Sequence, residues 1–337
     1  MAETNIRALA KELNLSISTV SKALRDSYEI SAETKQRVVK LAAELNYHPN
    51  IYASSLRRKK SNTIAVVIPE VADSFFSVAI KGIEEVAQTK GYHVLIYLTF
   101  ESFIKEKKIL EEFKNGRVDG VLMSVSSETT EFTHIETLNN SVPFVFFDRA
   151  VEEMEAARIT TNDFEISYEA TKHLIECGCK KIKYLSISNS LAINTKRIAG
   201  FKAAMNQFGI ELNEMNISNC SNCIEENSSL LETLLSGENK PDAIIASVEK
   251  LIAPVYSICQ TLAIQIPADL KVLCFSNLPI AHILNPSLTT VTQPAFDIGK
   301  MAATILFKSL EKRSFILKKE RLVVPSSLII RGSTVCK

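Results

Sequence analysis

From residue 61 onward, short apolar runs alternate with stretches that have the periodicity of amphipathic helices. The apolar runs predict four buried strands, at residues 64–69, 93–98, 120–125 and 143–148. The periodic stretches predict helices near residues 75–90, 103–115 and 129–139. Strands that are apolar on both faces and alternate with helices are typical of a parallel sheet covered by helices on both sides. This pattern constrains the fold more than any other feature of the chain.

The same alternation starts again in the next part of the chain. Three further apolar runs predict strands at residues 182–187, 242–247 and 271–276. Helices are expected near residues 164–177, 196–208, 227–236 and 249–262, and a final long helix at 294–311. Two sheets in one chain indicate two lobes, and open parallel sheets bind ligands outside the carboxyl ends of their strands. We therefore expect a ligand site in the cleft between the lobes.

The first sixty residues predict a separate module of three helices. Residues 4–13 have the apolar spacing of an amphipathic helix, and a second helix at 17–24 follows Ser16, a residue type that caps helices. A longer helix is expected from residue 31 to 45. Two short helices joined by a tight break are typical of a helix-turn-helix, whose second helix enters the major groove of DNA.

The outward residues and the charge of this module favour nucleic acid as its partner. Ile17, Ser18 and Lys22 lie on the outward side of the second helix, where side chains can reach base edges. Residues 1–60 contain eleven Lys or Arg and six Asp or Glu, a net charge of +5 against +1 for the whole chain. Basic residues of this kind release counterions from the phosphates of DNA. A helical bundle that binds a protein partner is the alternative.

The composition indicates a soluble protein that stays in the cytoplasm. The chain is 46% hydrophobic and 23% charged, and no segment approaches the ~20 unbroken apolar residues of a membrane span. The opening residues lack the layout of an export signal. Seven scattered cysteines favour reduced thiols over a disulfide framework. No metal or cofactor is expected, because Cys220 and Cys223 form a CxxC pair without a second half-site.

Three segments carry a more specific signal: LAKELNLSISTVSKAL, ISAETKQRVVKLAAELNYHPN and IYASSLRRKK. With these segments the chain resembles the lactose-repressor and galactose-repressor family of bacterial transcription regulators, and the resemblance continues along nearly its whole length. The family fold is an all-α helix-turn-helix headpiece followed by a bilobed α/β domain like that of periplasmic sugar-binding proteins, with two parallel sheets and three crossovers. The resemblance places the headpiece at residues 1–49, a hinge helix and linker at 50–60, and an effector-binding and dimerisation domain at 61–337.

The resemblance also divides the large domain into lobes. The first lobe takes residues of about 61–160 and 291–321, and the second takes about 161–290 and 322–337. The chain is accordingly expected to cross between the lobes near Thr160, Thr290 and Leu322.

The hinge segment matches the family at the residue that its members insert into the minor groove. Leu56 stands at that place, where an apolar wedge unstacks a base step and kinks the duplex. Arg57 and the basic residues after it would lie beside phosphates, and a flexible basic linker is the alternative. The residues expected to contact DNA are Thr4, Ser16, Ile17, Ser18, Thr19, Ser21, Lys22, Ser31, Thr34, Asn50, Ala53, Leu56 and Arg57.

Polar and aromatic residues follow the predicted strands and supply a candidate effector site. A carboxylate and a guanidinium can form paired hydrogen bonds to hydroxyls, while an aromatic ring covers the apolar face of a sugar. Each residue also has a purely structural alternative: Asp148 could cap a turn, Phe75 could be core, and Arg197 could pair with Asp148. The resemblance favours Asp148 and Arg197, because its FDR and RxxGF motifs occur at 147–149 and 197–201. The expected effector-binding residues are Ser74, Phe75, Phe76, Asp148, Arg149, Asn162, Arg197, Glu249, Ser276 and Gln293.

Two segments depart from the family pattern. Residues 274–277 read Cys-Phe-Ser-Asn where members often have glycine, an aromatic and two acidic residues, and residues 247–249 replace a commoner asparagine-aspartate pair. With fewer carboxylates and with Arg149 and Arg197 nearby, an acidic or phosphorylated sugar is one hypothesis for the effector. The general expectation is a small polar molecule of the sugar class.

The sequence favours a regulator over three other classes of protein. An enzyme is not indicated, because the sequence contains no GxSxG, GxGxxG, HExxH or Walker-type motif. A transport binding protein would need an export signal and would not need the basic first module. A DNA-binding protein without a ligand is the alternative that stays open, and an empty or apolar cleft would indicate it. We therefore expect a homodimeric repressor that reads a palindromic double-stranded operator and is controlled by a small-molecule effector.

Overall fold

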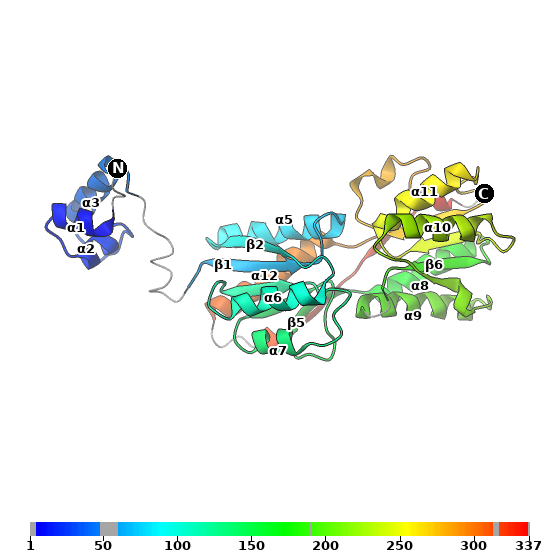
Figure 1. Cartoon of the computed structure of the whole chain (residues 1–337), viewed down its shortest axis with the longest axis horizontal. Coiled ribbons are helices and arrows are strands. Elements are labelled where there is room, and N and C mark those ends of the chain that lie inside the picture. The colour runs from blue at the N-terminus through cyan, green and yellow to red at the C-terminus, as the bar shows by residue number, and fades with distance from the viewer. Residues whose placement is uncertain (1–4, 48–59, 189–190, 313–316, 336–337) are drawn as a thin grey trace. The chain divides into compact units, whose positions relative to one another are not determined.

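The computed structural model describes residues 5–47, 60–188, 191–312 and 317–335. The chain divides into two units, residues 1–61 and 62–337. Three helices make up the described part of the first unit: α1 (Ile6–Glu12), α2 (Ile17–Ala23) and α3 (Ala32–Glu44) (Figure 1). The first helix begins at Ile6 and not at Thr4, because the side chain of Asn5 accepts hydrogen bonds from two backbone N–H groups of the first turn.

The second and third helices are capped as the sequence predicts. The Ser16 hydroxyl accepts a bond from the N–H of Thr19 at 3.0 Å, and the Ser31 hydroxyl accepts one from the N–H of Thr34 at 3.3 Å. The predicted apolar positions of all three helices meet in one core. Its buried members are Leu9, Ala10, Val20, Ala23, Val38 and Ala42.

The first sheet of the large unit has the strand order β11-β5-β4-β3-β1-β2 and is parallel at every pairing. Its strands are β1 (Thr63–Ile68), β2 (His93–Leu98), β3 (Gly120–Met123), β4 (Phe144–Phe147), β5 (Ala157–Thr161) and β11 (Arg321–Val324). One face is covered by α5 (Ser74–Thr89) and α12 (Ala295–Glu311), and the other by α6 (Phe103–Phe113) and α7 (Thr133–Asn139).

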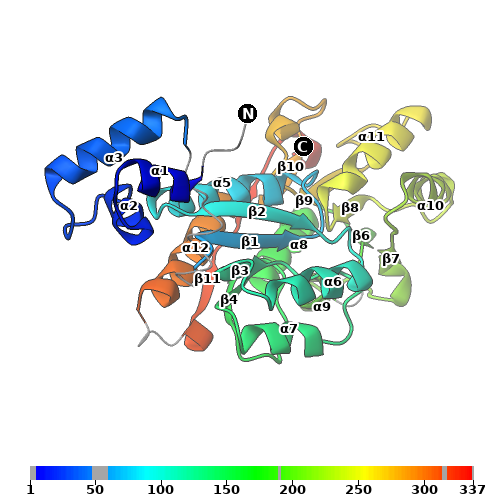
Figure 2. The ribbon, with the colours of Figure 1, turned by 60° about the vertical axis from the view of Figure 1, so that its left-hand side comes forward.

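Helices α5 and α12 lie side by side although they are far apart in the sequence (Figure 2). Glycines make this close approach possible. A Cβ atom on Gly299 would lie 2.0 Å from the carbonyl oxygen of Ala79, and one on Gly82 would lie 2.1 Å from that of Phe296. The same holds in the second lobe, where Gly200 of the RxxGF motif packs against the backbone of Phe164.

The second sheet has the order β12-β10-β9-β8-β6-β7. Its strands are β6 (Ile182–Ser186), β7 (Ile217–Asn219), β8 (Ala243–Ala246), β9 (Lys271–Phe275), β10 (Thr289–Thr292) and β12 (Ser327–Ile329). Helices α8 (Asp163–Glu176) and α9 (Ala192–Gln207) cover one face, and α10 (Ile224–Ser236) and α11 (Ile252–Thr261) cover the other. The expectation of two parallel sheets needs one correction, since β12 runs antiparallel to β10.

Short turns of 3₁₀ helix complete the described secondary structure. They are η1 (Glu214–Asn216), η2 (Glu249–Leu251), η3 (Pro279–His282), η4 (Leu317–Lys319) and η5 (Gly332–Thr334).

The chain passes between the two sheets after β5, after β10 and after β11. Each crossing lies slightly later than the expected points near Thr160, Thr290 and Leu322, because the strands keep their pairing up to the cleft. In particular, β11 pairs with β5 as far as Val324, so residues 322–324 belong to the first lobe. Two of the crossings are joined by a 2.7 Å hydrogen bond from the N–H of Ser326 to Oδ1 of Asn162.

Several local features differ from the expectations. Strands β5, β7, β11 and β12 were not predicted, and α9 begins at Ala192, one turn before residue 196. Cys177 is disulfide-bonded, so the expectation of reduced thiols is wrong at that position. Free thiols are found at Cys179, Cys220, Cys223, Cys259 and Cys274.

Neither a metal-binding cluster nor a membrane-spanning helix is found among the described residues. No group of three His, Cys, Asp or Glu side chains there could hold a metal ion. No helix among them combines the length and the apolar composition that crossing a membrane requires.

Candidate functional site

The first turn of α2 presents side chains to solvent, as expected for a helix that enters a DNA groove. Ile17 is 45% exposed and Ser18 is also exposed. The capping bond from Thr19 to Ser16 fixes this turn, and the Ser16 and Thr19 hydroxyls lie 2.9 Å apart. An exposed apolar residue at this place can contact a thymine methyl.

Other predicted DNA contacts already have partners within the module. Lys22 forms an ion pair with Glu29, and Ser21 accepts a hydrogen bond from Arg25 at 3.0 Å. The Ser31 hydroxyl donates to that of Thr34 at 3.0 Å. Exposed ion pairs are worth only about 0–1 kcal/mol, so Lys22 can exchange its partner for a phosphate. Thr4, Asn50, Ala53, Leu56 and Arg57 lie outside the described residues.

A pocket lies between the lobes of the large unit, at the carboxyl ends of strands from both sheets. Both lobes line it, and so does Gln293 on the crossing segment that follows β10. Seven of the ten residues expected to bind the effector are brought together here. They are Phe75, Phe76, Asp148, Arg149, Arg197, Ser276 and Gln293.

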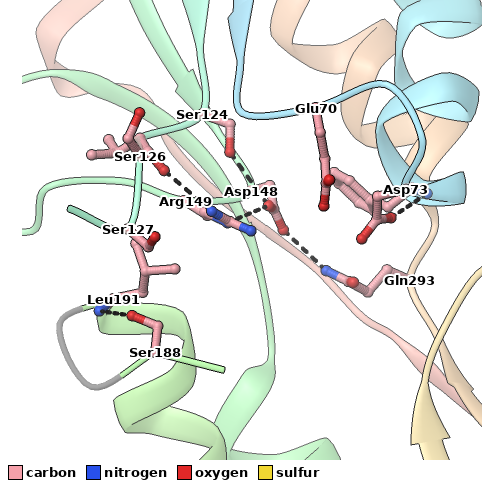
Figure 3. Close-up of polar contacts among 12 residues, drawn as sticks. Glu70, Asp73, Ser124, Ser126, Ser127, Asp148, Arg149, Ser188, Leu191 and Gln293 are labelled. Carbon is pink, nitrogen blue, oxygen red and sulfur yellow. Dashed lines mark hydrogen bonds and ion pairs between the residues drawn. The ribbon is translucent and has the colours of Figure 1, made fainter. Parts of the chain in front are cut away.

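Asp148 lies at the centre of the polar contacts in the pocket (Figure 3). Its backbone adopts a left-handed conformation with φ of 62°, which strains a residue other than glycine and often marks a functional site. The carboxylate accepts bonds from Gln293 Nε2 at 3.2 Å and from Ser124 Oγ at 3.4 Å. Burial raises the pKa of Asp148, although the charges of Arg149 and Arg197 act in the opposite direction.

Arg149 is held by a carboxylate that the sequence did not indicate. Its Nη1 donates to both carboxylate oxygens of Glu101, at 2.9 and 3.0 Å. Glu101 also accepts the backbone N–H of Ser127 at 2.7 Å. Burial alone would raise the pKa of Glu101, but the charge and hydrogen bonds of Arg149 outweigh it and lower this pKa.

Arg197 has its own carboxylate partner in the second lobe. Its Nε donates to Asp163 at 2.8 Å, its Nη1 donates to the carbonyl of Ser247 at 3.1 Å, and its guanidinium lies 4.1 Å from the centre of the Phe275 ring. The pairing of Arg197 with Asp148 that we considered is therefore replaced by pairing with Asp163.

Two polar groups of the pocket lack partners. Nη2 of Arg197 and Oγ of Ser247 are buried and have no hydrogen-bond partner among the described residues. Buried polar groups are nearly always paired, and those that are not call for an explanation such as a ligand. Both residues line the pocket, so a ligand hydroxyl there could accept from Arg197 and exchange a bond with Ser247.

The aromatic residues serve both the pocket and the core. Phe75 and Phe76 are 5% and 1% exposed and belong to the core of the first lobe, where Phe76 packs edge-on against Phe147. Phe75 is therefore a core residue, as the structural alternative had it, and it also lines the pocket as expected for the effector site. Phe275 is a further lining aromatic that the sequence analysis did not name.

Three of the expected residues, Ser74, Asn162 and Glu249, do not line this pocket. Oε1 of Glu249 accepts from both the backbone N–H and the hydroxyl of Ser74, each at 2.7 Å, and Oε2 accepts from Ser276 Oγ at 2.9 Å. Because Ser74 begins α5 in the first lobe and Glu249 lies in the second, the two bonds from Ser74 join the lobes. We call the contact between Ser74 and Glu249 the clasp.

The sequence analysis missed five polar or aromatic residues of the pocket: Asp73, Asn194, Ser247, Phe275 and Asn277. Ser247 and Phe275 lie at the ends of predicted strands, so the rule that ligands bind there could have found them. Asp73 was hidden because it precedes a helix, where a carboxylate usually serves as a cap, and it does accept the N–H of Phe75 at 2.8 Å. Burial and the nearby charge of Glu249 raise the pKa of Asp73 to about 6.

Two protein families match this chain. Residues 61–330 match the family of periplasmic binding proteins and sugar binding domain of LacI family. Residues 5–50 match the family of bacterial regulatory proteins, lacI family.

Individual relatives cover nearly the whole chain. The ribose operon repressor of Halalkalibacterium halodurans is 32% identical, over 98% of this chain and 97% of that protein. The catabolite control protein A of Priestia megaterium is 28% identical, over 97% of this chain and 98% of that protein. Among solved structures, the lac repressor dimer bound to operator and the anti-inducer ONPF has a TM-score of 0.85 at 20% identity, covering 98% of this chain and 99% of that one.

Proposed function

Because the chain belongs to the lacI family of bacterial regulatory proteins, it is a DNA-binding transcription regulator, and we propose that it represses genes under the control of a sugar or sugar derivative. One observation carries the proposal. The pocket between the lobes is lined from both of them and holds two buried polar groups, on Arg197 and Ser247, without partners among the described residues. Both groups belong to the second lobe, and a ligand that satisfies them also faces Phe76 and Asp148 of the first lobe.

The mechanism follows from unequal binding to two lobe arrangements. The ligand shifts the equilibrium between them only by the difference in its affinity for each. A pocket formed by both lobes provides that difference, because opening the lobes separates Asp148 and Phe76 from Arg197 and Ser247. The change in lobe arrangement then alters the affinity of the headpieces for operator DNA.

The headpiece reads the operator through the start of α2. Ile17 and Ser18 contact base edges, while Lys22 exchanges its bond with Glu29 for a phosphate. Leu56 opens a base step in the minor groove, so Leu56→Ala should weaken binding to operator more than binding to random DNA. Equal losses on both DNAs would contradict this role.

The regulator acts as a homodimer. Strand β2 is the edge of the first sheet and presents Leu95 and Ile96 to solvent, at 40% and 45% exposure. Phe100 and Ile104, which follow in the chain, are 61% and 77% exposed. An apolar edge strand is an aggregation hazard unless another chain covers it, and a second copy matches a palindromic operator.

The remaining expectations about the molecule follow from this role. A regulator of operator DNA works where the chromosome is, so the protein acts in the cytoplasm. Its cleft binds the effector without converting it, and neither a cofactor nor a metal ion takes part.

The test begins with operators found by a genomic footprint. Fluorescence anisotropy then measures operator affinity of the full-length protein in a titration with candidate sugars. We expect one sugar to change the affinity at least fivefold, and Arg197→Ala to abolish that response while ligand-free binding stays within twofold. If operator binding is specific but no small molecule changes it, the protein is a ligand-independent DNA-binding protein and the proposal fails.

A further inference from the structure

Each of the two guanidinium groups in the pocket is already paired with a carboxylate. Nη1 of Arg149 donates a hydrogen bond to Glu101, and Nε of Arg197 donates one to Asp163. Neither Glu101 nor Asp163 lines the pocket. Each lies behind its arginine as a dedicated counter-ion.

The carboxylates that line the pocket have no arginine that is hydrogen-bonded to them. Asp148 forms only a long ion pair with Nε of Arg149, at 3.8 Å, and Asp73 accepts a bond from the backbone N–H of Phe75. Four carboxylates therefore surround two guanidiniums, and Glu249 adds a fifth negative charge at the edge. Burial raises the pKa values of both Asp73 and Asp148, because a carboxylate that is removed from water loses the hydration of its charge.

The backbone holds this arrangement in place. Glu101 has φ of 62°, and Asp148 has the same value, so both carboxylates are carried by left-handed residues that pay a conformational cost. Glu101 is further fixed by the N–H of Ser127. The left-handed backbone and the bond from Ser127 therefore fix the Glu101 carboxylate in the position where it pairs with Arg149.

We propose that the pocket selects against anionic effectors and that Glu101 sets this selectivity by neutralising Arg149. This inference rests on the proposed function and narrows it: the effector is a neutral polyhydroxylated molecule. Its hydroxyls can both donate to Asp148 and accept from Arg197, whereas a phosphate dianion can only accept and would place its charge beside that carboxylate. This replaces the hypothesis of an acidic or phosphorylated sugar. That hypothesis considered the charges of Arg149 and Arg197 without those of Glu101 and Asp163, which pair with them.

A gain of phosphate binding tests the role of Glu101 without knowledge of the natural effector. Glu101→Gln removes the negative charge that is hydrogen-bonded to Arg149, so millimolar inorganic phosphate should raise the melting temperature of this variant relative to chloride at equal ionic strength. Wild type should show no such phosphate-specific rise. Glu112→Gln is the matched control, because Glu112 pairs with Arg117 at 2.7 Å on the surface and its loss changes the net charge equally.

Calorimetry on the wild-type protein gives an independent arm in case Glu101→Gln does not fold. Ribose, glucose and galactose are each compared with their phosphate esters, and every neutral sugar that binds should bind at least tenfold more tightly than its ester. Ser247→Ala should weaken that binding at least fivefold, whereas Ser326→Ala should not, because Ser326 has an equally buried, unpartnered hydroxyl outside the pocket.

The possible results separate this inference from the proposed function. Any one of three results would overturn the inference. Phosphate could stabilise the wild-type protein in a way that Arg149→Gln removes, or it could fail to stabilise a folded Glu101→Gln variant. The third such result is a phosphate ester that binds more tightly than its parent sugar. If none of the sugars binds, the inference is judged by the effect of phosphate on the melting temperatures of wild type and Glu101→Gln. A neutral sugar that binds without changing operator affinity would overturn the proposed function and leave the charge selectivity standing.

Discussion

The clasp between Ser74 and Glu249 should control how often the lobes separate. The backbone N–H of Ser74 lies in the first turn of α5, where a helix offers no internal partner, and it donates to Glu249 at 2.7 Å. Hydrogen bonds to a charged acceptor are roughly twice as strong as neutral ones, so Glu249→Gln should weaken each of the two bonds from Ser74 by about 1 kcal/mol. Together this is about 2 kcal/mol, or roughly a 30-fold increase in the open population.

Amide hydrogen exchange reads this opening directly. The Ser74 amide should exchange about 30-fold faster in Glu249→Gln, while amides in the interior of α5 keep their wild-type rates. Glu152→Gln is the control, since the ion pair of Glu152 with Lys196 also joins the lobes but is 45% and 42% exposed. Exposed pairs are worth about 0–1 kcal/mol, so its effect should stay below roughly fivefold. Unchanged exchange at Ser74 in Glu249→Gln, or equal acceleration in both variants, would refute the reasoning.

Three further predictions concern stability and assembly. Folding raises the pKa of Asp73 from 3.8 to about 6, so the folded protein binds a proton more tightly than the unfolded chain, and the free energy of unfolding should rise as the pH falls from 7 to 4. Asp73→Asn should flatten this pH dependence in urea titrations. An unchanged dependence in the variant would argue against the role of Asp73. Gly299→Ala should cost about 3 kcal/mol or more by forcing α12 away from α5, whereas Gly237→Ala, whose new Cβ meets its nearest atom at 3.5 Å, should cost less than about 1 kcal/mol in the same thermal melts. Ile96→Lys should dissociate the dimer in sedimentation experiments without lowering the melting temperature of the lobes, and a dimer that persists would move the interface elsewhere.

Much of the fold could be predicted because it is encoded locally. The caps Ser16 and Ser31 act within one helical turn, and the central strands of both sheets are continuous apolar runs. The strands that escaped prediction lie at or near sheet edges, where only part of the strand is buried. In β5 buried and half-buried residues alternate, and β11 and β12 have no buried residue at all.

The candidate site was only partly predictable, because its partners are distant in sequence. Asp148 and Arg197 follow from strand ends and from the family motifs. Glu101 is 48 residues from Arg149, and Glu249 is 175 residues from Ser74, so no spacing rule connects them. The net charge around the pocket depends on such pairs, which is why an anionic effector was one hypothesis from the sequence alone, whereas the pairs in the folded chain argue against it.

One measurement tests the central claim that a ligand in the cleft controls the grip on DNA. The affinity of the full-length protein for its footprinted operator is measured across a titration with the neutral sugar that binds it, in wild type and in Ser247→Ala. We predict that saturating sugar changes the wild-type affinity by a factor of about 5 to 150, and that the midpoint shifts to higher sugar concentration in the variant while ligand-free affinity is unchanged. Operator affinity that stays constant across the titration, with calorimetry showing the cleft occupied, would contradict the account.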